Sequence, residues 1–182
     1  SLKGSYPDAH YNLANALLEK GRAQEAAEHF RIALQSIPDS AGAANNLGVA
    51  LANQNRPADA VAAFRAAVAA EPGSAVAHRN LADALATAGD VAGAVTAFAR
   101  AAELDPNDPA TPYNLGVVLI EAQRLPEAVV ALRRAVALAP NSVDAHNTLG
   151  IALGSSGDLD GAIAEFRRAL ALSVVVPGPR KA

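Results

Sequence analysis

The 182-residue sequence lacks cysteine, methionine and tryptophan, and only 4% of its residues are aromatic. The absence of cysteine excludes disulfides, thiolate metal ligands and thiol nucleophiles, and it leaves the redox compartment open. No apolar run approaches the roughly 18 residues that a membrane helix needs. Basic and acidic residues nearly balance, 15 against 18, whereas a dedicated nucleic-acid binder carries a strongly basic surface. We therefore expect a soluble chain, with the cytoplasm as the favoured compartment, that binds neither nucleic acids nor membranes.

Catalytic and cofactor-binding motifs are missing as well. The sequence contains no phosphate-binding G-x-x-x-x-G-K-[ST] and no dinucleotide-binding G-x-G-x-x-G. The segment Gly154–Gly157 lacks the spacing of the G-x-S-x-G nucleophile elbow and follows a predicted helix rather than a strand. Asp158 and Asp160 are interpreted as acids near a helix N-terminus, where they complement its partial positive charge. We expect no enzyme activity, no cofactor and no metal.

Alanine is abundant, with 46 of the 182 residues, and it belongs to an internal repeat of 34 residues. The repeat divides the chain into units 7–40, 41–74, 75–108, 109–142 and 143–176. Its columns are Pro38, Pro72, Pro106 and Pro140; Leu13, Leu47, Leu81, Leu115 and Leu149; Ala26, Ala60, Ala94, Ala128 and Ala162; and Phe30, Phe64, Phe98, Leu132 and Phe166.

Each unit predicts two helices. In the first unit, Leu13, Ala14 and Leu17 form the apolar stripe of a helix over about residues 8–20, and a second stripe runs from Ala26 to Leu34. Between them lies a position that favours left-handed backbone, occupied by Gly21, Asn55, Gly89, Gln123 and Gly157, of which Gln is the poorest choice. Small residues at a third column allow the paired helices to approach closely: Ala14, Gly48, Ala82, Gly116 and Gly150. One pair cannot bury enough apolar surface, so the pairs must stack into a solenoid.

This pattern resembles the tetratricopeptide repeat family: LA or LG, Gly at the turn, EA or DA, an aromatic, AL or AV, and Pro. The resemblance covers residues 7–176. It implies an all-α fold, a right-handed superhelical solenoid of five helix-turn-helix repeats, whose first helices line a concave groove that binds proteins or peptides. The family's usual Trp is replaced by His10, Ala44, His78, Pro112 and His146, and Val174 stands where Pro is expected.

The two ends depart from the repeat. Residues 1–6 match the phase of an earlier repeat's tail, or are a sequence added for expression, and residues 177–182 are expected to be a disordered tail. The family usually ends its arrays with a polar capping helix, which Val174–Val176 followed by Pro177 cannot form. Either the sequence is a piece of a longer array, or a partner covers the last helix. The apolar residues near that end predict weak self-association, and they are Ile163, Phe166, Leu170, Leu172 and the valine run.

The recurring histidines suggest packing rather than metal binding. His10, His78 and His146 lie 68 residues apart, two repeats in each step. First helices two repeats apart should be separated by about 20 Å, given roughly 8–10 Å between packed helices. Metal ligands lie about 2 Å from one ion. We therefore expect these side chains to fill the place of the family's Trp.

The groove is where the resemblance suggests a binding site. Its lining is predicted to hold a column of asparagines, each able to grip a peptide bond at two points, although packing between helices is the alternative role. The column resembles the groove of the O-linked N-acetylglucosamine transferases. The family's carboxylate clamp is not expected, since Tyr11, Val76 and Asn80 stand at its cation positions. The predicted peptide-binding residues are Tyr11, Asn12, Asn15, Asn45, Asn46, Arg79, Asn80, Tyr113, Asn114 and Asn147.

Charge narrows the predicted ligand. The groove positions carry one cation, Arg79, against five carboxylates, so we expect a protein or extended peptide that is neutral to basic; the carboxylates are Asp8, Glu19, Asp83, Glu121 and Asp144. An outer row of arginines could instead bind acidic partners. It is more simply a solvated face with ion pairs such as Glu28–Arg31 and Glu165–Arg168, although Arg133 and Arg134 have no carboxylate three or four residues away.

The sequence therefore predicts a protein- or peptide-binding scaffold. Two alternatives stay open. One is a substrate-targeting domain of a larger enzyme such as a glycosyltransferase, and the other is a self-assembling scaffold.

Overall fold

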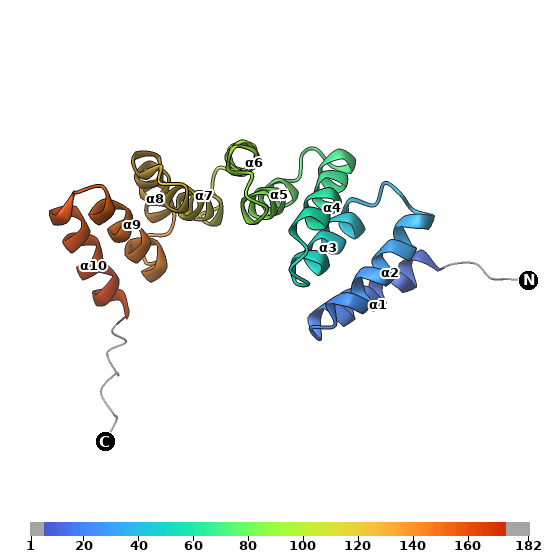
Figure 1. Ribbon diagram of the computed structural model, residues 1–182. Helices are drawn as coiled ribbons and strands as arrows, with labels where there is room; N and C mark the ends of the chain where they lie inside the picture. Colours follow the sequence, from blue (N-terminus) through green and yellow to red (C-terminus); the bar gives the residue numbers. More distant parts are fainter. Residues whose placement is uncertain (1–5, 174–182) are drawn as a thin grey trace, which may run out of the picture. The chain divides into compact units, whose positions relative to one another are not determined.

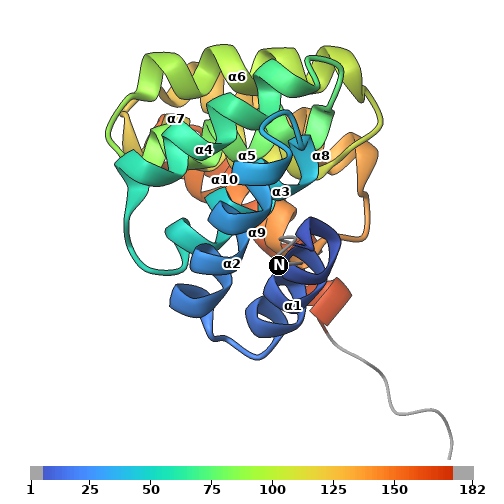
Figure 2. The same cartoon turned by 90° about the vertical axis from the view of Figure 1, so that its right-hand side faces the viewer.

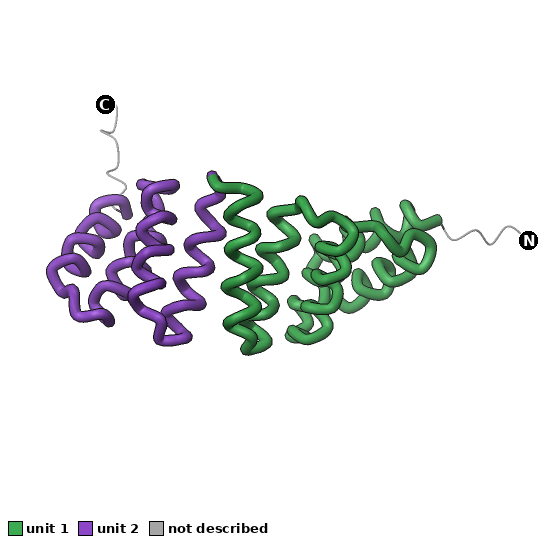
Figure 3. The backbone as a smooth tube through the Cα atoms, turned by 90° about the horizontal axis from the view of Figure 1, so that it is seen from above, with its two compact units in different colours: residues 1–106 green, residues 107–182 purple. Residues whose placement is uncertain are grey.

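The computed structural model describes residues 6–173, so the predictions for residues 1–5 and 174–182 lie outside it. The described part contains ten α-helices and no strand (Figure 1). They form two compact units, residues 1–106 with α1–α6 and residues 107–182 with α7–α10 (Figure 3). The helices are α1 (Pro7–Glu19), α2 (Ala23–Ser36), α3 (Ala41–Ala52), α4 (Pro57–Ala70), α5 (Ala75–Thr87), α6 (Val91–Leu104), α7 (Ala110–Glu121), α8 (Leu125–Leu138), α9 (Val143–Ser155) and α10 (Leu159–Ser173).

Every first helix ends in the same left-handed turn. Gly21 has φ +73°, and its N–H donates to the carbonyl of Leu18 (3.0 Å) while that of Arg22 donates to Leu17 (2.9 Å). These two bonds satisfy carbonyls that the end of a helix leaves without partners. The turn recurs with positive φ at Asn55, Gly89, Gln123 and Gly157. The turn prediction is therefore confirmed, Gln123 included.

Three of the first helices, α3, α5 and α9, begin with a serine cap at the same repeat position. Ser40 Oγ accepts the N–H of Ala43 (3.3 Å), and Ser74 and Ser142 cap α5 and α9 in the same way. The segment that follows each repeat proline thus ends one helix and also starts the next.

Second helices begin in one of two ways. In α6, Asp90 accepts the N–H of Gly93 (2.9 Å), and in α10 Asp158 does the same for Gly161 (2.9 Å). An ideal Cβ at either glycine would lie very close to the capping carboxylate, so a larger residue there needs the aspartate side chain to shift. In α2, α4 and α8 an arginine replaces the aspartate and pairs with an acid three residues on: Arg22–Glu25, Arg56–Asp59 and Arg124–Glu127.

Small residues allow close packing inside each pair. An ideal Cβ at Gly48 would lie 2.6 Å from the ring of Phe64, and one at Gly116 would lie 2.5 Å from Leu132. The large side chain of the second helix therefore lies directly on the backbone of the first. The aromatic column is almost fully buried through the first four repeats, at Phe30, Phe64, Phe98 and Leu132. The predicted packing role of both columns is confirmed.

Within each unit the pairs stack through the second helix of one repeat and the first helix of the next. Helix α2 packs on α3 and α4 on α5, and in the other unit α8 packs on α9. Figure 2 shows α1 and α2 side by side at the N-terminal end of unit 1. Leu13, predicted to belong to an apolar stripe, is 46% exposed, whereas Leu47 at the same repeat position in α3 is 8% exposed under α2. Repeat position alone does not bury a residue; a preceding helix is also needed.

None of the ten helices in residues 6–173 is long and apolar enough to cross a membrane.

Candidate functional site

Four asparagines on the first helices of unit 1 form one chain of hydrogen bonds. Asn80 on α5 donates its Nδ2–H to Oδ1 of Asn45 on α3 (2.9 Å). Asn45 donates in turn to Asn46 (3.2 Å), and Asn46 donates to Oδ1 of Asn15 on α1 (2.8 Å). The chain runs in one direction through three consecutive repeats. It therefore joins the first helices of unit 1 to one another.

The asparagines keep hydrogen-bonding capacity beyond this chain. All four are half-buried, so their side chains still reach solvent. An asparagine amide has two N–H donors and an oxygen that can accept twice. The chain uses one N–H each of Asn80, Asn45 and Asn46 and none of Asn15. At least one N–H of each asparagine takes no part in this chain.

Sequence reasoning treated each asparagine as separate and did not anticipate this chain. The spacing in the sequence could have predicted it, because the fifth position of one repeat and the sixth position of the next lie 35 residues apart. Asn80 and Asn45 have that separation, and Thr148 and Tyr113 have it too. Ligand binding and helix packing do not exclude each other, because one amide can use some of its hydrogen-bonding atoms for a neighbouring helix and the others for a ligand.

Unit 2 carries three more of the predicted site residues. Tyr113 and Asn114 lie on α7, and Asn147 lies exposed on α9. The hydroxyls of Thr148 and Tyr113 are 3.5 Å apart, which is a weak contact. The remaining predicted residues belong to unit 1: Tyr11 and Asn12 lie on α1, and Arg79 lies on α5.

The histidines contact a side chain of their own repeat, a carbonyl at the end of the preceding repeat, or both. His146 is 6% exposed; its Nδ1 lies 2.6 Å from Glu165 Oε2 and its Nε2 lies 3.0 Å from the Pro140 carbonyl. The two contacts hold the ring from both of its nitrogens, between the second helix of its own repeat and the turn before it. His10 and His29 occupy the same two repeat positions, with their Nδ1 atoms 2.8 Å apart. In residues 6–173 no three metal-ligating side chains come together.

The outer ion pairs differ from the predicted ones. Glu165 binds His146 and not Arg168, and neither Glu28 nor Arg31 has a side-chain partner among the described residues.

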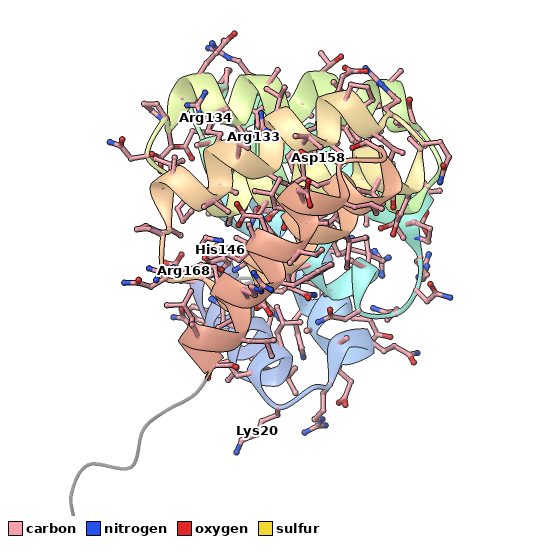
Figure 4. All side chains as sticks on the ribbon, turned by 90° about the vertical axis from the view of Figure 1, so that its left-hand side faces the viewer. Lys20, Arg133, Arg134, His146, Asp158 and Arg168 are labelled. Carbon is pink, nitrogen blue, oxygen red and sulfur yellow. The ribbon has the colours of Figure 1, made fainter. Side chains whose placement is uncertain are left out.

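The hydrogen bond from Arg22 lowers the pKa of Glu25, and that from Arg124 lowers the pKa of Glu127. The exposed arginines of unit 2 are labelled in Figure 4 on α8 and α10, at Arg133, Arg134 and Arg168.

Helix pairs of one length, joined by one kind of turn and stacked through equivalent faces, define a helical-repeat scaffold for protein interaction. The chain belongs to the tetratricopeptide repeat family. Profiles of this repeat match residues 3–41, 11–75 and 45–109, then 85–150, and finally 143–173. Members of this family are typically not catalytic.

Solved structures show the same fold. A structure of MamA residues 41 to the end from Desulfovibrio magneticus RS-1 is similar at TM-score 0.85 and 21% identity, covering 93% of this chain and 96% of that one. A second MamA structure has TM-score 0.83 and 22% identity, covering 91% of each chain. YrrB, described as a TPR protein with an unusual peptide-binding site, has TM-score 0.75 and 21% identity, covering 90% and 84%. Comparison with curated proteins gave no match.

Proposed function

We propose that the chain is a scaffold whose unit 1 binds an extended peptide through the peptide's backbone. The observation that carries this proposal is the chain of amides from Asn80 to Asn15. A free asparagine loses side-chain freedom when it binds, whereas these side chains are already ordered by one another. Pre-ordering of this kind lowers the entropic cost of binding.

Three further points support the proposal. Proteins of this family bind peptides or proteins, and YrrB is described as having a peptide-binding site. Unit 1 carries 8 basic and 11 acidic residues, which favours a neutral to basic ligand. The resemblance of the sequence pattern to the groove of the O-linked N-acetylglucosamine transferases suggests the same use of amides, which we propose for this chain. Such a surface would also suit the substrate-targeting domain of a larger enzyme such as a glycosyltransferase.

The test separates backbone recognition from side-chain recognition. A peptide is first selected on the immobilised chain from a displayed library of random twelve-residue sequences. Two series of its variants are then compared by fluorescence polarisation, one with single alanine substitutions and one with single N-methylated peptide bonds. Backbone reading predicts that several N-methyl variants bind about two- to tenfold more weakly, since N-methylation removes a peptide N–H that an asparagine oxygen would accept and each lost bond costs roughly 0.5–1.5 kcal/mol. Full affinity in every N-methyl variant would contradict the proposal.

A second proposal is weak head-to-tail self-association. On α10, Ile163 and Leu170 are 48% and 66% exposed, at the positions where α2 presents Ala27 and Leu34 to α3. On α1, Leu13 is exposed at the position that α3 offers to α2. The α10 face of one copy can therefore pack on the α1 face of another, and such a contact forms open chains.

Light scattering tests this second proposal. We expect the average mass to rise with concentration and Leu170→Glu to abolish the rise. Val130→Glu is the matched control, because Val130 is 70% exposed on α8. A constant monomer mass at millimolar concentration would sink the proposal.

A further inference from the structure

Each unit contains a pocket built from the same eight repeat positions. The pocket of unit 1 has about 210 Å³ and the pocket of unit 2 about 190 Å³. Each lies where the N-terminal turns of two successive first helices meet the C-terminal end of the second helix between them. Every lining residue of one lies 102 residues, or three repeats, from its counterpart in the other, for example Tyr11 and Tyr113.

Only the first and fourth repeats combine a proline at position 1 with a tyrosine at position 5, and these two repeats form the pockets. Pro7 and Tyr11 line the first pocket, and Pro109 and Tyr113 line the second. The ring of Tyr11 is held edge-on against Phe30, with centroids 5.9 Å apart. A Cβ at Gly42 would lie 3.3 Å from the Tyr11 hydroxyl, so the glycine lets the ring lie over the next helix.

The two pockets also share their chemistry. The lining of each contains one carboxylate and no basic side chain, with Asp8 in the first pocket and Asp144 in the second. The two aspartates come from opposite walls, since Asp8 belongs to the earlier helix of its pocket and Asp144 to the later one. An apolar wall faces them, made of Ala33 and Ile37 in unit 1. Each pocket therefore has one negative charge, although the aspartate that carries it stands at a different repeat position in each.

Size and charge together define the occupant. Pockets that hold whole small ligands measure about 300–1,000 Å³, so these smaller ones suit a single side chain. The C-terminal end of α2 or α8 adds partial negative charge to its pocket. The N-termini of the two first helices add partial positive charge, which the full negative charge of the aspartate offsets. The pocket therefore favours a cation. A long basic side chain can lay its methylene stem on the apolar wall and bring its cation to the carboxylate and the tyrosine ring.

We infer that each pocket takes one lysine or arginine side chain of the bound partner. This inference rests on the proposed function in one respect: the basic side chain is taken to belong to the peptide that the chain binds. The aspartate pairs with the cation, the tyrosine provides a flat aromatic wall, and the apolar residues cover the stem. The partner therefore carries a basic residue for each pocket that it fills.

A third pocket shares five of these positions in the last repeat, with Val143 and Asn147 in place of the proline and the tyrosine, and Asp144 lines both this pocket and the second one. It is not assigned the same ligand.

The experiment uses single amino-acid derivatives on the whole chain, so that the asparagine chain is not needed for binding. N-acetyl-lysine methylamide is titrated while amide signals are followed by ¹⁵N NMR, with the norleucine and glutamate derivatives as controls. We expect the signals of Gly42 and Ala43 to report the first pocket, and those of Tyr113 and Ala145 the second. The norleucine derivative, which keeps the stem without the charge, should bind at least about tenfold more weakly, and the glutamate derivative should not bind.

The two pockets serve as controls for each other. Asp8→Asn should remove lysine binding at the first pocket and leave the second unchanged, and Asp144→Asn should do the reverse. Glu28→Gln, at an exposed carboxylate on α2, should change neither. Equal binding of lysine and norleucine derivatives, or unchanged binding after both aspartate substitutions, overturns the inference.

The result is independent of the proposed function. A chain whose asparagines are replaced should still bind the lysine derivative. Full affinity of that variant for the selected peptide would contradict the proposed recognition of the peptide backbone. If the aspartate variants still lose the preference for basic residues, the inference about the pockets is supported all the same.

Discussion

Replacing Phe64 with alanine should cost unit 1 a large part of its stability. The ring is 3% exposed and lies on the backbone of Gly48, where an ideal Cβ would come within 2.6 Å of it. Glycine has no side chain that could move into the vacated space, so the cavity stays open. Truncation of a buried phenylalanine costs about 3–5 kcal/mol. A domain of the size of unit 1 has roughly 5–16 kcal/mol at about 0.05–0.15 kcal/mol per residue.

Urea denaturation followed by circular dichroism measures the loss. With a slope near 2 kcal/mol per molar, the midpoint of the affected transition should fall by about 2 M. Since α4 links α3 to α5 and repeats couple only to their neighbours, the lesion should also split the unfolding of the chain into two steps.

Phe166 provides a matched control. It occupies the same column and lies on Gly150 in the same way, but it is only partly buried. Phe166→Ala should cost at least about 1 kcal/mol less than Phe64→Ala, because solvent already reaches the ring. A loss below about 1 kcal/mol for Phe64→Ala, with one sharp transition, refutes the packing argument.

Three further predictions follow from the helix ends and the histidine pair. Asp90→Ala removes the cap of α6 and should cost about 0.5–2 kcal/mol in urea denaturation, whereas Asp39→Ala, at an exposed turn residue, should cost less than about 0.5 kcal/mol. Arg22→Gln removes the hydrogen bond that lowers the pKa of Glu25, so carboxyl NMR should show that pKa rising to its ordinary value; the pair helps at neutral pH and loses its effect as the pH falls through the lowered pKa. Glu165→Ala leaves His146 Nδ1 without its acceptor and should cost about 1–3 kcal/mol, while Glu165→Gln keeps an acceptor oxygen and should cost less; equal losses would show that the contact is not what matters.

The repeat made the helices and their packing predictable. The columns that contain Phe30 and Ala26 recur with the same 34-residue spacing. Residues at the same position of successive helix pairs therefore pack against equivalent neighbours. Membership of an apolar stripe does not by itself predict burial: Leu13 is 46% exposed on α1, which has no preceding helix among the described residues.

Contacts between side chains of different repeats were less predictable. The hydrogen bond from Asn80 to Asn45 depends on how far α5 is offset from α3, which no single repeat contains. The pairing of Glu165 with His146 was missed because helical spacing suggested Arg168, whereas the histidine faces Glu165 across the helix pair. The pockets required the three-dimensional meeting of three helices, although the recurring Pro and Tyr at repeat positions 1 and 5 were visible in the sequence.

Two combined variants decide whether the asparagine amides of unit 1 hold the ligand. The first variant carries Asn45→Ala, Asn46→Ala and Asn80→Ala, and the second carries Arg133→Ala and Arg134→Ala on α8. Each is checked for helicity, and its affinity for the selected peptide is measured by fluorescence polarisation. We expect the asparagine variant to lose about one to three decades of affinity, at roughly 0.5–1.5 kcal/mol per lost contact, while the arginine variant binds like the wild type. Wild-type affinity in the asparagine variant, with binding lost in the arginine variant, would show that the ligand binds to α8 and not to the asparagines.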